Sequence, residues 1–151
     1  MPSKVDFLLA AKRHWQDAGL LESNTRMKNA GQLYGFSAEC GIKALMVALG
    51  YPTDAEGSPQ KRKLLPSGVP EIRRHIHEFV GVIGDIQNYA HGRNGAKYTA
   101  LFPSVTNFSD WTTDHRYWTD AAIPNSLSAW KVAAKEVMGM LDAASLDGVL
   151  K

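Results

Sequence analysis

The sequence predicts an all-α protein, an antiparallel bundle of four or five helices with a long aromatic-rich insertion before the last helix. Apolar residues recur every three or four positions in four segments, which is the period of an amphipathic helix. The hydrophobic content of 44% and the charged content of 21% are typical of a folded globular chain. A length of 151 residues corresponds to a single domain, residues 1–151.

The first two helices are expected to form a hairpin at the start of the chain. The first runs from about residue 4 to residue 20, with Ser3 as its N-cap. The second begins near residue 24 or 25 and ends before Gly50. Because apolar residues cover much of its circumference, we expect the second helix to be central and well covered.

The third helix is expected from about Glu71 to His91, after a proline-rich loop at residues 51–70. Residues 93–124 show no sustained period but hold six of the fourteen aromatic residues, so we expect an ordered excursion that packs on the bundle. The last helix should start after Asn125 or Ser126. The apolar stripe of the third helix comprises Ile72, Ile76, Phe79, Ile83, Ile86 and Ala90.

The composition and the absence of certain motifs limit the compartment, the partners and the cofactors that we expect. The single cysteine, Cys40, excludes an internal disulfide and favours a reducing, cytoplasmic compartment, where we expect it to be inert core. No apolar run is long enough to span a membrane, and the first residues do not resemble a signal peptide. The net charge of +2 is compatible with a polyanionic partner. No motif indicates a cofactor or a metal ligand set.

A second stripe on the third helix carries polar and small residues. His77, Gly81, Gly84, Asn88 and His91 recur at spacings of four, three, four and three. Glycine is unfavourable inside a helix by about 1 kcal/mol relative to alanine. Two glycines on one face therefore predict the close approach of another backbone, either within the bundle or across a two-fold dimer axis.

His91 is the first catalytic candidate, because histidine exchanges protons near neutral pH and Asn88 could hydrogen-bond at the same place. The alternative is that His91 only favours a helix C-terminus, where the dipole stabilises imidazolium. His75 and His77 flank Ile76 and are expected to point in different directions as surface residues.

Glu39 and Lys43 form an i,i+4 pair that is either an exposed ion pair or part of a polar pocket against the third helix. In that pocket Glu39 could orient a histidine. Arg116 could neutralise a phosphate while an adjacent aromatic ring stacks a base. Alternatively, Tyr117 and Trp118 only anchor the loop. The basic run 61–63 could touch a phosphate backbone or simply be solvated.

Residues 30–46, which contain the Ala38-Glu39-x-x-x-Lys43 core, resemble the second helix of HEPN domains (higher-eukaryote and prokaryote nucleotide-binding). The expected order of helices is similar as well, with a third helix that ends in His91, and the later Trp111…Arg116-Tyr117 pattern resembles small bacterial HEPN-like proteins. The resemblance implies a dimeric helical bundle. It also implies, in many members, a metal-independent ribonuclease of a toxin–antitoxin, phage-defence or RNA-processing system.

The resemblance is incomplete at the catalytic signature of the family, an arginine and a histidine with four to six residues between them. His91 matches the histidine, whereas Gly84, Asp85 and Ile86 occupy the positions of the arginine. Because a cation should stabilise the charge that develops on the phosphate, Arg93 or Arg116 would have to supply it, from the same chain or across a dimer.

Three functions are open at this point. The first is a homodimeric HEPN-like protein that acts on RNA or nucleotides, with His91 as acid or base, Arg93 or Arg116 on the phosphate, and Asn88 and Glu39 positioning the histidine. The second is a non-catalytic dimeric module that binds a cognate protein partner or a nucleotide. The third is a bundle that binds a small molecule against the aromatic insertion.

Overall fold

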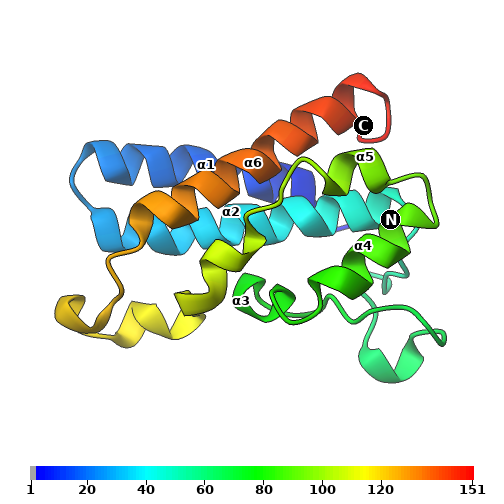
Figure 1. Ribbon diagram of the computed structural model, residues 1–151, viewed down its shortest axis with the longest axis horizontal. Helices are drawn as coiled ribbons and strands as arrows, with labels where there is room; N and C mark the ends of the chain where they lie inside the picture. The colour runs from blue at the N-terminus through cyan, green and yellow to red at the C-terminus, as the bar shows by residue number, and fades with distance from the viewer. Residues whose placement is uncertain (1–2) are drawn as a thin grey trace.

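The computed structural model describes residues 3–151, and the regular secondary structure in that range is helical, with no strand (Figure 1). Three helices are long: α1 (Phe7–Ser23), α2 (Met27–Ala48) and α6 (Leu127–Leu146). None of the described helices combines the length and the apolar character needed to cross a bilayer. The short elements are η1 (Arg62–Leu64), α3 (Ile76–Phe79), α4 (Ile83–His91), α5 (Ala96–Thr99), η2 (Val105–Asp110), η3 (Thr113–Tyr117) and η4 (Asp120–Ala122).

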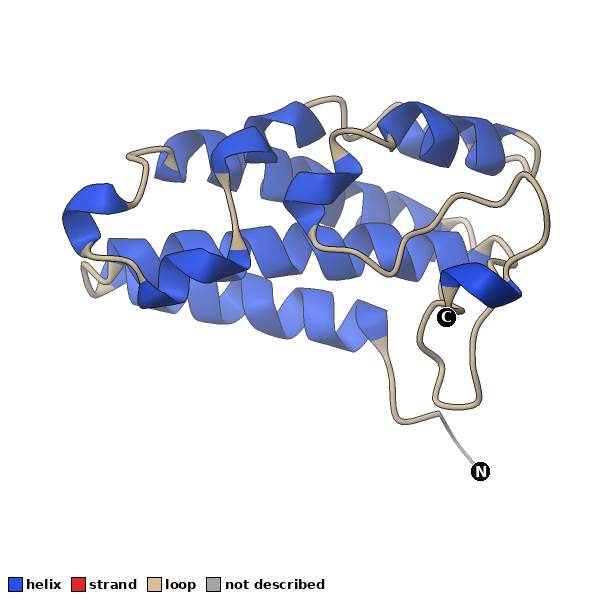
Figure 2. Cartoon of the chain, turned by 90° about the horizontal axis from the view of Figure 1, so that it is seen from below, coloured by secondary structure: helices blue, strands red, loops and turns tan. Residues whose placement is uncertain are grey.

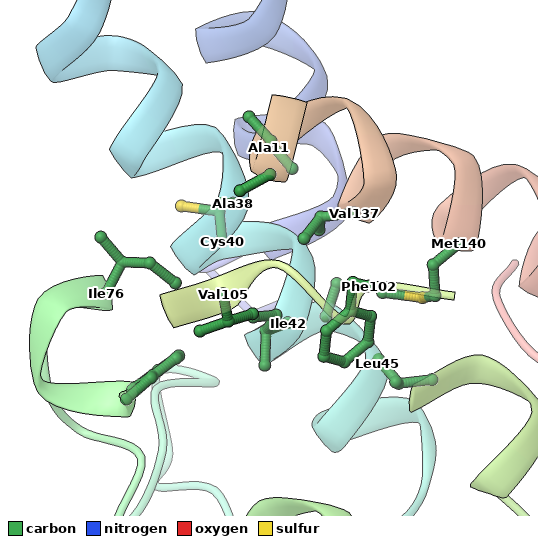
Figure 3. Close-up of a cluster of buried hydrophobic side chains, with 14 of the residues drawn as sticks. Ala11, Ala38, Cys40, Ile42, Leu45, Ile76, Phe102, Val105, Val137 and Met140 are labelled. Atoms are coloured by element: carbon green, nitrogen blue, oxygen red, sulfur yellow. The ribbon is translucent and has the colours of Figure 1, made fainter. Parts of the chain in front are cut away.

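The central element is α2, as the sequence predicts. It lies against both α1 and α6, and every residue from 37 to 46 is buried. The core that surrounds it draws side chains from α1, α3, α6 and the segment after α5, including Ala11, Ile76, Phe102 and Val137 (Figure 3). A helix covered on several sides needs apolar or small residues around most of its circumference, which is the pattern of this segment.

The direction of α6 differs from the expected antiparallel arrangement. Gly31 of α2 lies against Trp130, and Gly41, ten residues further along, lies against Val137 and Leu141. The contacted residue numbers increase together in the two helices, so α6 runs parallel to α2 and antiparallel to α1 (Figure 1). The long connection from residue 49 to residue 126 returns the chain to the start of α2, which makes a parallel pair possible.

The expected third helix is wrong in extent. Residues 71–75 are not helical, and the remainder is divided into α3 and α4 by a turn that contains Gly81. Two hydrogen bonds from other elements hold the preceding segment and the start of α3: Ile72 N donates to Tyr51 Oη at 3.3 Å, and Ile76 N donates to Glu39 Oε1 at 3.0 Å. Tertiary partners of the backbone thus compete with helix formation at the start of the predicted segment.

The apolar stripe of that segment is nevertheless largely buried. Ile72, Ile76, Phe79 and Ile86 are fully buried although they lie on three different local structures. The pattern of apolar residues identified the inward side of the chain correctly, but it did not reveal the break in the backbone, because short helices and turns can place the same residues against a core.

The segment between α4 and α6 is ordered by aromatic side chains. Tyr98, Phe102, Phe108 and Trp111 are buried, whereas Tyr117 and Trp118 are exposed by 76% and 45%. Residues 96–122 form short helical turns around the buried rings, visible along the side of the three long helices (Figure 2). The part of this segment near residues 117 and 118 presents aromatic surface to solvent.

The start of α1 also differs from expectation. Asp6, not Ser3, is the N-cap, and its Oδ1 accepts a hydrogen bond from Leu9 N at 2.9 Å. The Ser3 hydroxyl instead donates to the carbonyl of Glu56 at 2.6 Å and ties the first described residues to the loop after α2. A carboxylate can cap a helix as well as a hydroxyl does, so both residues satisfied the sequence rule.

Candidate functional site

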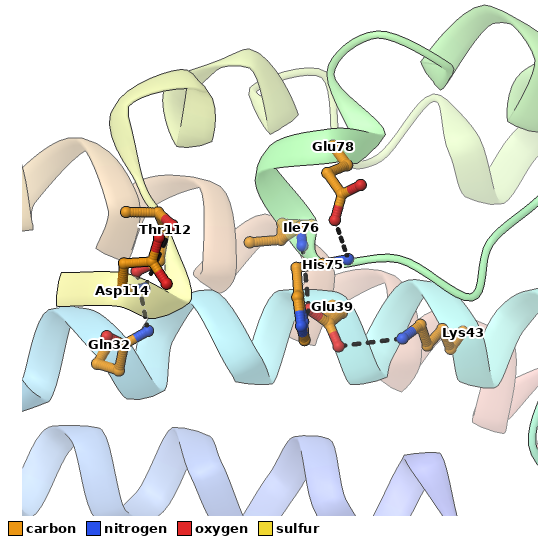
Figure 4. A network of polar contacts seen from close by, with 8 residues as sticks. All are labelled: Gln32, Glu39, Lys43, His75, Ile76, Glu78, Thr112 and Asp114. Atoms are coloured by element: carbon orange, nitrogen blue, oxygen red, sulfur yellow. Dashed lines mark hydrogen bonds and ion pairs between the residues drawn. The ribbon is translucent and has the colours of Figure 1, made fainter. Parts of the chain in front are cut away.

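A nearly buried carboxylate joins α2 to the start of α3. Glu39 is 7% exposed, and its Oε1 lies 3.1 Å from His75 Nδ1 and accepts a hydrogen bond from Ile76 N at 3.0 Å (Figure 4). Its Oε2 accepts from Lys43 Nζ, also at 3.0 Å. Of the two arrangements open for the Glu39–Lys43 pair, the structure shows the polar pocket, and the histidine beside Glu39 is His75.

The extended backbone before α3 brings two histidine rings together. His75 has φ −91° and ψ 161°, and side chains two residues apart in extended chain lie on the same side. The rings of His75 and His77 are nearly parallel, with centroids 6.4 Å apart. The expectation that they point in different directions is therefore wrong, because it assumed a helix through both residues.

His75 links the buried network to solvent, since its side chain is 48% exposed while that of Glu39 is 9% exposed. A carboxylate accepts hydrogen bonds and does not donate them, so Glu39 favours the His75 tautomer with the proton on Nδ1. That tautomer leaves the Nε2 lone pair free to accept a proton. The second ring is different: Nδ1 of His77 is buried and has no hydrogen-bond partner among the described residues.

Residues of α1 complete the surface around Glu39. The rings of His14 and His75 both lie near Phe36, with centroids 5.7 Å and 6.5 Å from the phenyl centroid. Burial and the neighbouring Arg13 lower the pKa of His14, while Asp17 and Glu39 oppose that shift. We call the surface formed by His14, Phe36, Glu39, His75 and His77 the histidine surface.

A second polar region lies along α4 and faces the loop that precedes α3. Two adjoining hollows, of about 540 and 310 Å³, share Val69, Pro70 and Asp85. Asn88 and Arg93 line the larger hollow, so the structure brings two of the predicted site residues together. We call the two hollows the α4 groove; its charged and amide lining residues are Arg62, Glu71, Arg74, Asp85, Asn88 and Arg93.

The cations of the α4 groove differ in their engagement. Arg74 pairs with Glu71 at 3.2 Å and with Glu78 at 3.6 Å. Arg93 has its guanidinium 3.6 Å from the centroid of the Tyr89 ring and donates from Nη1 to the carbonyl of Tyr89 at 3.3 Å. Neither Arg62 nor Arg93 takes part in an ion pair with another residue of the range 3–151.

His91 lies apart from the other predicted site residues. It is exposed at the end of α4 and does not line either hollow, and its Nε2 is 3.5 Å from Thr99 Oγ1. The glycines of the same stripe have no close backbone neighbour in the described chain: a Cβ on Gly84 would meet nothing within 4 Å, and one on Gly81 only Glu78 O at 3.8 Å. The expected close approach within the bundle is therefore wrong, and the approach across a dimer stays a prediction.

Arg116 lies in η3, toward the other end of the molecule from the C-terminus of α4 (Figure 1). It is exposed, with its guanidinium 4.8 Å from the centroid of the Tyr117 ring. Trp111 and His115, not Tyr117 and Trp118, are the buried anchors of this segment. His115 contacts the rings of Trp118 and Trp130, at centroid distances of 4.7 and 5.7 Å. Within one chain, Arg116 is thus not a partner for His91.

Cys40 and the remaining candidate ligands show no reactive arrangement. Cys40 is buried, and burial raises the pKa of its thiol to about 11, in agreement with the expected inert core residue. No three histidine, cysteine, aspartate or glutamate side chains within residues 3–151 converge as a set that could hold a metal ion.

Sequence reasoning missed His75 as the partner of Glu39 and missed the arginines that line the α4 groove. A signal was present for His75: Glu78 follows it at the three-residue spacing of a capping box, and in the structure His75, the N-cap of α3, donates from its backbone N–H to Glu78 Oε1 at 3.2 Å. No local pattern pointed to Arg62 or Arg74, because the loop that carries them is positioned only by the fold.

No family model matches the chain, and comparison with curated proteins and with solved structures finds no significant match. The two polar regions themselves are therefore the basis for a functional proposal.

Proposed function

We propose that this protein binds RNA in the α4 groove, through contacts to the phosphate backbone. The observation that carries the proposal is the placement of Arg62 and Arg93, two cations without an ion-pair partner in residues 3–151, along one groove with Asn88. Guanidinium groups bind phosphate oxygens in a bidentate way, and an amide side chain can donate to a phosphate or to a base edge.

The charge around the groove favours a polyanion. Lys61 and Lys63 flank Arg62 and are exposed, so the rim adds two more cations beside the lining arginines. The acidic lining residues are Glu71, which is already paired with Arg74, and Asp85. Cations thus outnumber carboxylates along the groove, although the whole chain has a net charge of only +2. Such local excess of positive charge is the electrostatic footprint of a nucleic-acid interface.

The HEPN resemblance forms part of this proposal. The long α2 with its Glu39–Lys43 pair, and an all-helical chain, are in keeping with a HEPN-like bundle. In such a protein the RNA-directed activity would belong to a toxin or phage-defence system, and a second copy of the chain could complete the site. The degenerate signature at His91 fits the exposed position of that residue, outside the groove.

Binding of a labelled single-stranded RNA, followed by fluorescence anisotropy at low salt, tests the proposal. We expect Arg62→Gln combined with Arg93→Gln to weaken binding at least tenfold, because neither side chain can then make a charge-assisted hydrogen bond to phosphate. The matched control combines Arg26→Gln with Lys135→Gln, which removes two exposed cations elsewhere and should change affinity little. Equal effects of the two double variants, or no binding by the wild-type protein, would contradict the proposal.

A second candidate is a non-catalytic interaction module, favoured by the exposed aromatic residues of the long connection. Tyr117 is 76% exposed and Trp118 is 45% exposed, beside the exposed Arg116. Aromatic residues and arginine are enriched at the centres of protein interfaces. Tyr117→Ala combined with Trp118→Ala should abolish association with a protein partner if this function holds, and should leave RNA binding by the α4 groove intact.

A further inference from the structure

Asp85 does not fit a groove that binds phosphates alone. It is exposed, lines both hollows of the α4 groove, and takes part in no ion pair within residues 3–151, although arginines line the same groove. A free carboxylate opposes the binding of phosphate, because like charges repel. Its presence favours a ligand that also brings hydrogen-bond donors, since an ionised carboxylate only accepts hydrogen bonds.

The position of Asp85 in α4 adds an amide beside the carboxylate. Asp85 lies in the first turn of α4, where a negative charge interacts favourably with the helix dipole. That interaction uses the charge and leaves the exposed carboxylate oxygens open to a ligand. Asn88 is three residues further on, and residues three apart are neighbours on a helix surface. Asp85 and Asn88 therefore stand side by side, and both line the larger hollow.

The larger hollow also contains a flat surface on which a base can stack. The Arg93 guanidinium carbon lies 3.6 Å from the centroid of the Tyr89 ring, a contact distance for stacked planar groups. Tyr89 is 6% exposed whereas Arg93 is exposed, so the guanidinium covers the ring and presents its other face outward. Unpaired RNA bases stack on guanidinium planes as they do on aromatic rings. A hollow of about 540 Å³ is large enough to admit one nucleobase.

We propose that the larger hollow selects guanine in single-stranded RNA and that Asp85 specifies the base; this inference rests on the proposed RNA binding. The Watson–Crick edge of guanine carries two adjacent donors, N1–H and the N2 amino group, which the two oxygens of one carboxylate accept together. Adenine, cytosine and uracil place an acceptor beside their donor, and a carboxylate repels that acceptor. The Asn88 amide donates to guanine O6, and the base stacks on Arg93.

The test uses labelled oligouridines that carry one central guanosine, inosine or adenosine, followed by fluorescence anisotropy at low salt. We expect the wild-type protein to bind the guanosine RNA at least about tenfold more tightly than the adenosine RNA, as is typical of a bidentate contact to a base. Inosine keeps N1–H and O6 but lacks the N2 amino group, so its RNA should bind with intermediate affinity. This comparison changes only the ligand and does not depend on the folding of any variant.

Asp85→Asn separates base selection from charge. The substitution removes a negative charge from the groove, so the affinity for the adenosine RNA should stay the same or rise, whereas the preference for guanosine should fall by about tenfold. A role in the helix dipole or in the charge of the groove would change the affinities for all three RNAs by one common factor. Asp142→Asn, which removes an exposed carboxylate of α6, is the matched control and should keep the wild-type preference.

Arg93→Lys tests the stacking surface. Lysine keeps the positive charge but lacks the flat guanidinium, so the salt dependence of binding should stay near that of the wild-type protein. The affinities for the guanosine and adenosine RNAs should fall together, because both bases lose the plane on which they stack. Unchanged affinities for both RNAs would place the base away from Arg93 and overturn the proposed site.

The outcomes separate this inference from the proposed function. Equal binding of the three RNAs by the wild-type protein overturns the selection of guanine and leaves RNA binding in the α4 groove standing. A preference for guanosine that Asp85→Asn retains overturns the role of Asp85. Absence of binding to all three RNAs overturns the RNA-directed function, and the inference falls with it.

Discussion

The indole of Trp111 lies directly against the backbone of Gly35: a Cβ on Gly35 would be 2.1 Å from Cε2 of that ring. Trp111 Nε1 also donates a hydrogen bond to the carbonyl of Gly31 at 3.1 Å. The long connection between α5 and α6 is thus anchored on α2 at a point where the helix has no side chain.

Gly35→Ala should destabilise the protein by at least about 1–3 kcal/mol, the usual effect of forcing extra volume into a packed core. The control is Gly139→Ala in α6, where an added Cβ would meet nothing within 4 Å. That substitution should raise stability by up to about 1 kcal/mol, because alanine favours a helix interior. Urea unfolding of both variants measures the difference, and equal stabilities would contradict the packing.

The sequence predicted the long helices because each carries a continuous amphipathic or fully apolar pattern. It did not predict which glycines allow close packing. The stripe that contains Gly81 and Gly84 predicted a close approach there, whereas indole rings approach Gly31 and Gly35. A glycine needed for close packing is recognisable only from its partner. In this fold that partner is about a hundred residues further along the chain for Gly31 and about eighty for Gly35.

The site was predictable to a similar degree. The i,i+4 spacing of Glu39 and Lys43 correctly offered a buried polar pocket against the next segment as one alternative. The sequence pattern could not identify His75 as the partner of Glu39, because residues 71–75 were expected to be helical and are not. The backbone bonds of Ile72 and Ile76 to Tyr51 and Glu39 decide that local structure.

Glu39→Ala should be strongly destabilising, by about 3–5 kcal/mol, because it leaves the 8% exposed Lys43 without its partner and removes the acceptor of Ile76 N. Combining it with Lys43→Met should recover a large part of that loss, since no buried charge is then left unpaired. Chemical denaturation measures both. A double variant as unstable as Glu39→Ala would show that the buried charge of Lys43 is not the cause.

Acid should destabilise the protein through His115. Burial lowers the pKa of His115 from 6.5, opposed by Asp110 and Asp114 and helped by His77. As the pH falls, His115 therefore binds a proton in the unfolded chain at a higher pH than in the folded state. Its contribution to stability is complete above about pH 6.5 and is lost as the pH falls through the lowered pKa of the folded state.

His115→Gln cannot titrate and should lose less stability than the wild-type protein between about pH 7.5 and pH 5. His14, whose pKa is also lowered by burial, adds a second contribution that His14→Gln removes. Urea midpoints at the two pH values measure the effect. An identical loss of stability in the wild-type protein and in the variant that combines His115→Gln with His14→Gln would show that these two histidines do not cause the acid destabilisation.

The most direct measurement of RNA binding in the α4 groove is the dependence of affinity on salt. Each phosphate contact to a single strand contributes about 0.7 to the slope of log affinity against log salt concentration. We predict that Arg62→Gln combined with Arg93→Gln lowers the magnitude of the slope by about 1.4, because two phosphates are no longer neutralised. The Arg26→Gln and Lys135→Gln control should keep the wild-type slope. A slope that is unchanged when Arg62 and Arg93 are replaced would show that RNA does not lie in this groove.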